Sequence, residues 1–314
     1  MSRSPGASVG GQAVIEGVMV RAPAAWAVAV RRPDGVIEGQ RHELPALTSR
    51  TRAARTPLLR GILVLIEALT LGFRALSWSA QKAGDEDEQL SRWQVALTMA
   101  VAVFLALALF IVAPALGAGF LKRFLGDDSL AFVVLDGLLR ILLIVGYIWL
   151  IGRSPEVRRV FQYHGAEHKA IHAFENGKPL GVEDVQAFSP RHPRCGTSFI
   201  IIVAIVAFVV FLFLAPAPLL WQILGRLLLI PVIAGLSYEV LKAAAGRRWL
   251  AWASRPGIWI QAITTSEPSD DMVEVAVAAL LTALDRDAVA EVKQRGEVAP
   301  GALAAVVDAG AGDG

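Results

Sequence analysis

Residues 95–121, VALTMAVAVFLALALFIVAPALGAGFL, carry no formal charge. The run is longer than the roughly 20 apolar residues that a helix needs to cross a bilayer, so it predicts a transmembrane helix. The rest of the 314-residue chain agrees, because 55% of it is hydrophobic and only 18% is charged. A soluble domain of this size carries more charge. The composition therefore indicates an integral membrane protein.

Further apolar runs predict more spans. Residues 130–151 form a second span, in which Asp136 and Arg140 lie one helical turn apart and would neutralise each other. Residues 199–225 are uncharged but are interrupted by two prolines, so they predict the end of a third span and the start of a fourth. The expected fold class is an α-helical polytopic membrane protein with about four transmembrane helices within residues 94–242.

The basic residues predict the orientation. Lys and Arg concentrate in residues 1–93, in the loop 152–198 and after residue 241, whereas the other two connections carry few. Loops rich in Lys and Arg stay on the cytoplasmic side, so we expect a multi-pass protein of the cytoplasmic (inner) membrane with both termini in the cytoplasm. The single cysteine excludes an internal disulfide and a four-cysteine zinc site.

The polar regions predict a cytoplasmic α+β layer. Residues 1–57 are β-rich, with a meander over 11–45 whose hairpin turn is Pro-Asp-Gly at 33–35. Residues 243–300 predict a strand, GIWIQAITT at 257–265, followed by a helix. The Ala- and Gly-rich tail 301–314 predicts disorder.

Residues 58–80 predict an apolar helix with a charged stripe. Arg60, Glu67 and Arg74 recur every seven residues and so lie on one side of the helix. The pattern favours an interfacial or half-buried amphipathic helix, with a fifth span as the alternative.

Three of the five histidines lie in YHGAEHKAIHAFE, residues 163–175. A serine cap followed by proline predicts a helix over 155–175, which places His164, His168 and His172 on one face. Histidines four residues apart can share one zinc ion. His164 and His172 are separated by about 12 Å of helix rise and cannot share one. The ion would therefore lie between His168 and one of its two neighbours.

HGAEH, residues 164–168, fits the pattern H-x-x-E-H, in which two histidines bind zinc and the glutamate activates water. Glu167 would then be the catalytic base. A proline-punctuated loop on the same cytoplasmic segment adds His192 and Cys195. The alternative is a hydrogen-bonded polar helix face without an ion. The candidates for a third ligand are Glu239, Cys195 and Glu175.

Four motifs together resemble those of the YqhQ family of bacterial membrane proteins. They are GGQAVIEGVMVR (10–21), YHGAEHKAIHAFE (163–175), HPRCGTSF (192–199) and ITTSEPSDDMVEVAVAAL (263–280). The resemblance covers most of the chain and implies a metal-dependent enzyme. The positions that it marks are Gln12, Glu16, Arg21, His164, Glu167, His168, His192, Arg194, Cys195 and Glu267. The chain departs from the family pattern at Val20, Ala170 and Ser266.

The marked positions suggest roles around the histidine helix. Gln12 and Glu16 share a face of a regular strand and would point at that helix, and Arg21 would lie on the opposite face. The residues expected to bind substrate or support the ligands are Gln12, Glu16, Arg21, His172, His192 and Arg194. The alternative for the strand residues is that they satisfy one another within the small sheet.

The expected function is a membrane-embedded, metal-dependent enzyme, a hydrolase acting at the cytoplasmic face with a divalent ion such as zinc. A non-enzymatic membrane adaptor or assembly factor is the alternative, and a transporter of ions or small solutes is a third possibility. The expected partners are the lipid bilayer and a substrate of unidentified class, without nucleic acid. The sequence leaves the oligomeric state open.

Overall fold

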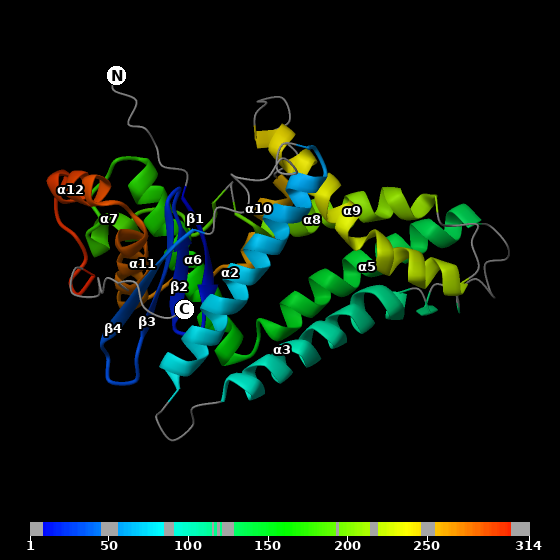
Figure 1. Cartoon of the computed structure of the whole chain (residues 1–314), viewed down its shortest axis with the longest axis horizontal. Helices are drawn as coiled ribbons and strands as arrows, with labels where there is room; N and C mark the ends of the chain where they lie inside the picture. The colour runs from blue at the N-terminus through cyan, green and yellow to red at the C-terminus, as the bar shows by residue number, and fades with distance from the viewer. Residues whose placement is uncertain are drawn as a thin grey trace.

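The computed structural model combines a small α+β layer with a bundle of apolar helices (Figure 1). The expectation of a mostly helical protein with a small sheet is confirmed. The structure describes residues 9–44, 56–84, 91–114, 116–117, 120, 129–192, 195–213, 219–245 and 255–302. The expected tail beyond residue 302 lies outside these ranges.

The sheet is an antiparallel meander of four strands in sequence order. Its strands are β1 (Gly10–Val14), β2 (Gly17–Arg21), β3 (Ala25–Arg31) and β4 (Ile37–Glu43). Gly35 adopts a φ of 84° in the turn before β4, where a residue with a side chain would be strained. The middle strands β2 and β3 are almost wholly apolar and buried, because both faces of the sheet are covered.

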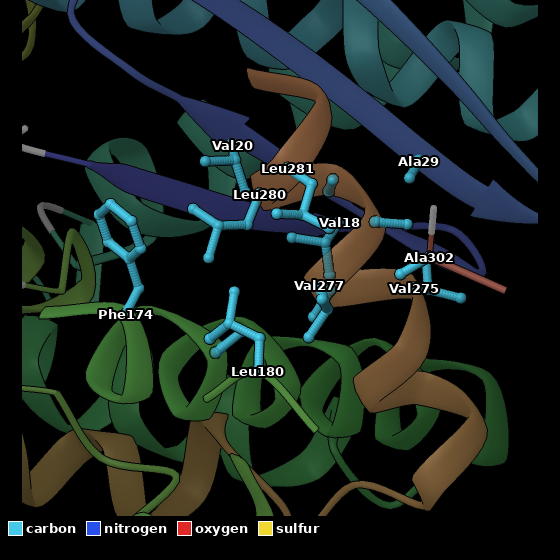
Figure 2. Close-up of a cluster of buried hydrophobic side chains, with 14 of the residues drawn as sticks. Val18, Val20, Ala29, Phe174, Leu180, Val275, Val277, Leu280, Leu281 and Ala302 are labelled. Carbon is cyan, nitrogen blue, oxygen red and sulfur yellow. The ribbon is translucent and has the colours of Figure 1, made fainter. Parts of the chain in front are cut away.

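Helices cover the two faces of the sheet. On one face, α11 (Asp270–Ala283) packs against β2 and β3, and α6 (Pro155–Glu175) packs against α11 and β1. Figure 2 shows this core, in which Val18 and Val20 of the sheet meet Val277 and Leu280 of α11. The short helices α7 (Val182–Gln186) and α12 (Arg286–Arg295) lie at its edge (Figure 1).

The opposite face of the sheet packs on α2 (Leu59–Ala83). Leu71 and Ala75 of this helix join Met19 and Val28 in a second buried cluster. The other side of α2 exposes apolar side chains, among them Ile66, Leu69 and Phe73. The charged stripe predicted for residues 58–80 is divided: Glu67 is buried, whereas Arg74 is exposed.

Four apolar helices form the bundle beside this layer (Figure 1). They are α3 (Arg92–Leu107), extended by the π-helical turn η3 (Ala108–Val112), α5 (Ser129–Ile151), α8 (Thr197–Leu212) and α9 (Leu219–Ala245). Within the described residues, Val134–Ile151 and Leu224–Ala243 are long and apolar enough to cross a membrane, judged by length and composition. Ala96–Val112 and Phe199–Leu212 are shorter apolar helices.

Two glycines bring α2 close to α9. A Cβ atom on Gly61 would lie 2.9 Å from the Cα atom of Gly235, and one on Gly235 would lie 2.7 Å from the carbonyl oxygen of Leu58. Small residues allow such close approach of two helix backbones. One turn of α9 further along, the Arg60 guanidinium of α2 donates to Glu239 through Nε at 2.6 Å.

The prediction of a strand at 257–265 is wrong. This segment lies in α10 (Arg255–Thr264), which packs on α8 and α5. The alternation of apolar residues suggested a strand, but the buried positions Gly257, Ile260, Gln261 and Thr264 follow helical spacing. The following segment also divides into two helices, because Asp285 caps α12 by accepting from the Ala288 amide at 2.8 Å.

Candidate metal centre

Two histidines of α6 are oriented by backbone carbonyls. The Nδ1 atom of His164 lies 2.8 Å from the Thr264 oxygen, and that of His168 lies 2.6 Å from the Pro190 oxygen. A carbonyl can only accept, so each Nδ1 carries the proton and donates it. Each Nε2 therefore presents a lone pair. Metal-binding histidines are held in this way, with the second ring nitrogen donating to a carbonyl or carboxylate.

Cys195 completes a group of three ligand atoms. Its Sγ lies 3.2 Å from Nε2 of His164, and the ligand atoms of His164, His168 and Cys195 all lie within 4.8 Å of one another. Nitrogen and sulfur ligands of a tetrahedral zinc ion are about 3.5 Å apart, so a small contraction would close the site. The Nε2 atom of His168 is buried and has no hydrogen-bond partner among the described residues. The donor set therefore fits a metal ion with one open coordination position.

Burial sets the protonation of the two histidines. It lowers the pKa of His164, and burial together with the neighbouring His164 lowers that of His168 to about 3. Both imidazoles are neutral near pH 7, the form in which histidine binds a metal.

Glu167 lies beside the trio, on the same turn of α6. It is 4% exposed, and its Oε2 atom lies 3.5 Å from Nε2 of His168. Burial raises the pKa of this carboxyl group to about 8, although the backbone N–H of Gly11 donates to it and lowers the pKa in part. A nearby cation would favour the ionised form, because opposite charges stabilise each other. Glu167 thus lies next to the ligand atoms as a buried carboxyl group.

Glycine allows the backbone partner of His164 to come close. A Cβ atom on Gly165 would lie 2.1 Å from the Ser266 oxygen, so no other residue fits without moving α6. The Ser266 amide also donates to the Phe161 oxygen at 3.0 Å. Together these contacts hold the end of α10 against the histidine helix.

A cleft of about 680 Å³ lies over this centre, between the sheet and α2. Its polar lining includes Glu167, His168 and Cys195, with Gln12 and Arg21 on the sheet. Arg21 also donates to Glu67 of α2. Much of the remaining wall is apolar, contributed by residues such as Val9, Met19, Val64, Leu71 and Ile171. A molecule that reached the ligand atoms would therefore contact apolar surface as well.

Other predicted residues lie outside the trio. Glu239 is paired with Arg60 at the crossing of α2 and α9. Glu175 lies 3.3 Å from Nε2 of His192, and the ring of His192 lies 4.3 Å from that of His172. Of the three proposed third ligands, only Cys195 meets both histidines. Arg194 lies outside the described residues.

The strand residues are placed differently from the prediction that Gln12 and Glu16 share a face. Glu16 lies in the turn after β1 with a φ of 51°, so the alternation of a regular strand does not reach it. It accepts from Arg159 at 2.6 Å and from the Tyr163 hydroxyl at 3.2 Å, both on α6. The side chain of Gln12 instead lies against Gly72 of α2.

Several supporting groups could not have been found from the sequence. The groups of Thr264 and Pro190 that bind the histidines are backbone carbonyls, which every residue has, so the residue types do not reveal them. The side-chain amide of Gln261 accepts from the His192 N–H and donates to the His192 carbonyl. The partner of Arg21 was detectable in principle, because Glu67 is a lone acid in an apolar helix.

Comparison with known proteins identifies the family. Residues 56–286 match the model of the DUF1385 family of proteins of unknown function. The chain belongs to this family. It is also 35% identical over 303 residues to "Uncharacterized protein YqhQ" of Bacillus subtilis (strain 168), covering 91% of this chain and 95% of that protein. The predicted resemblance is thereby confirmed. No solved structure matches significantly.

Proposed function

We propose that this protein is a metal-dependent hydrolase of the bacterial cytoplasmic membrane, with its reaction centre at the cytoplasmic face. The observation that carries the proposal is a pair of imidazoles held by backbone carbonyls, with ligand atoms that lie within 4.8 Å of one another and of one thiol. An adaptor surface would expose these side chains, whereas His168 is 2% exposed and its Nε2 atom has no hydrogen-bond partner. A nitrogen and sulfur donor set favours zinc over magnesium or calcium.

The bundle supports the membrane location. Only 17% of the window Val134–Ile151 and 28% of Leu224–Ala243 are buried, which is unlike the core helices of a soluble protein. Large apolar side chains cover their outer surfaces, including Leu138, Leu142, Leu228 and Val240. With α3 and α8 as further spans, the Lys and Arg distribution would place α6 and the sheet in the cytoplasm.

The residues of the centre would have separate roles in hydrolysis. His164, His168 and Cys195 would hold the ion, which would lower the pKa of a water molecule and so supply a nucleophile near neutral pH. Glu167 would accept the proton of that water as its oxygen attacks the scissile bond, and would return it to the leaving group. The cleft would hold the substrate between Arg21 and the apolar wall of α2.

Metal analysis tests this proposal. Protein purified in neutral detergent without chelator should contain about one zinc ion per chain. His164→Ala and His168→Ala should lose it, because two remaining ligands seldom hold zinc against chelators. His172→Ala is the matched control and should retain it, since its ring lies one turn further along α6 next to His192.

Glu167→Gln separates metal binding from catalysis. It should retain the ion and lose hydrolysis, because an amide cannot accept the proton. The proposal fails if wild-type protein contains no stoichiometric transition metal and gains no thermal stability from added zinc, manganese or iron.

A further inference from the structure

A second charged cluster lies inside the helical bundle, away from the metal centre. Asp136 of α5 accepts from Arg140 at 3.3 Å and from Arg226 of α9 at 2.9 Å. The side chains of Asp136 and Arg226 are each 3% exposed, and that of Arg140 is 9% exposed. Two cations thus share one anion, and the cluster keeps one positive charge in a buried position.

This surplus charge cannot be removed by deprotonation, because arginine stays protonated in proteins. A buried charge without a counter-ion is costly, and most of all within a bilayer. Among the described residues, no second carboxylate pairs with Arg140 or Arg226. The ring of Phe211 lies 5.0 Å from one guanidinium and 5.2 Å from the other and offsets part of the charge. The Nε atom of Arg226 remains buried without a hydrogen-bond partner.

A cavity of about 260 Å³ adjoins the two arginines. Its remaining wall is apolar and comes from α2, η3, α5, α8 and α9, including Leu65, Ile111, Ile144, Val203 and Ile233. Two of the lining residues, Ile200 and Ile230, are 39% and 38% exposed. Arg140 and Arg226 are therefore the two charged residues in the wall of an otherwise apolar cavity, which borders the outer surface of the bundle at Ile200 and Ile230.

We propose that this cavity binds an anionic amphiphile from the bilayer. Its carboxylate or phosphate head group pairs with Arg140 and Arg226 and supplies the missing negative charge, while its acyl chain lies along the apolar wall. A hydrated inorganic anion fits less well, because the described residues that line the cavity are apolar apart from the two arginines. The inference rests on the proposed membrane location and is independent of the metal centre.

Thermal unfolding of the full chain in dodecyl maltoside tests the site. Dodecyl phosphate should raise the unfolding temperature by roughly 5 °C or more at saturation. Dodecyltrimethylammonium has the same chain and the opposite charge, and inorganic phosphate has the head group without the chain. Neither should produce this rise. An equal rise with the cationic amphiphile or with inorganic phosphate would overturn the proposal.

Arg140→Met removes the surplus charge and leaves the pair of Arg226 and Asp136. Its unfolding temperature without ligand should equal or exceed that of the wild type, and its response to dodecyl phosphate should be lost. Arg153→Met is the matched control: Arg153 stacks on Trp149 at the other end of α5. It should keep the response. A full response in Arg140→Met would overturn the assignment.

A second measurement covers the case in which Arg140→Met does not fold. Native mass spectrometry of the wild-type protein should detect a bound anionic lipid that dodecyl phosphate displaces. Detection of only zwitterionic lipid, or of none after mild purification, would overturn the proposal. Zinc content plays no part in either measurement, so these results and those on the metal centre stand separately.

Discussion

Glu67 is a single acid in an apolar helix, and its surroundings determine how α2 packs. It is 3% exposed, it accepts from Arg21 of the sheet, and its Oε2 atom is buried without a hydrogen-bond partner. A helix lying in the interface with its stripe toward water would leave this carboxylate hydrated. Periodicity assigned Arg60, Glu67 and Arg74 to one stripe of the helix, but it could not show which of them would be buried against the sheet.

Glu67→Lys should therefore be strongly destabilising. It would place a second cation against Arg21 at a buried position of α2. The Arg21 side chain is 36% exposed, so the loss of this half-buried pair should lower the free energy of unfolding by up to about 3 kcal/mol. The folded yield should fall sharply in size-exclusion chromatography. Arg74→Glu is the control on the same stripe. Because Arg74 is exposed, this substitution should change the free energy of unfolding by no more than about 0.5 kcal/mol. A wild-type yield for Glu67→Lys would contradict the observed packing.

At the scale of elements, local chemistry predicted α6 well and α10 poorly. The prediction of a helix over 155–175 is confirmed: Ser154 accepts from the Val157 amide at 3.3 Å, and Pro155 starts the first turn. These signals are local and could be recognised from the sequence. The burial of α10 depends instead on α8 and α5, so its short apolar alternation was ambiguous.

The same distinction applies to the candidate site. The spacing of His164 and His168 follows from the helix, and it was predictable. Their carbonyl partners at 190 and 264 come from tertiary contacts and were not. The choice of Cys195 over Glu239 likewise depended on where α9 packs, because Arg60 holds that glutamate at another helix crossing.

The crossing of α2 and α9 depends on two glycines without side chains. Gly61→Ile should separate the helices, because even a Cβ atom would lie within 2.9 Å of backbone on Gly235. Overpacking of this kind lowers the free energy of unfolding by about 1–3 kcal/mol or more. The unfolding temperature and the folded yield should therefore both fall. Gly146→Ile in α5 is the matched control, since a Cβ atom there meets nothing within 4 Å. Equal stability of the two variants would argue against the close crossing.

For the whole molecule, the candidate metal centre lies where the α+β layer meets the helical bundle. Cys195 lies two residues before the start of α8, and Thr264 ends α10, which packs on the bundle. Hydropathy and charge predicted a helical membrane protein with a polar layer. They could not predict that the sheet would be covered by α11 from near the other end of the chain, because that pairing depends on tertiary contacts between distant parts of the sequence.

The single thiol provides a test of orientation. A membrane-impermeant maleimide should leave Cys195 unmodified in intact cells and modify it in inverted vesicles, because the proposed topology places it at the cytoplasmic face. Added zinc should slow the reaction by occupying the thiolate. Cys195→Ser provides the background signal. Modification in intact cells would contradict the proposed cytoplasmic location of Cys195 and indicate the opposite orientation.

The pairing of the sheet with α11 also constrains how the protein is made. Arg31 of β3 donates to the Asp271 carbonyl at 2.8 Å, across 240 positions of the chain. The ribosome therefore releases the strands long before their covering helix exists, and under the proposed membrane topology the apolar helices would enter the translocon in between. During that interval one face of the nascent sheet has no partner. Such exposed strands aggregate readily, so this protein should depend on a chaperone, or on the ribosome surface itself, until its last helices emerge.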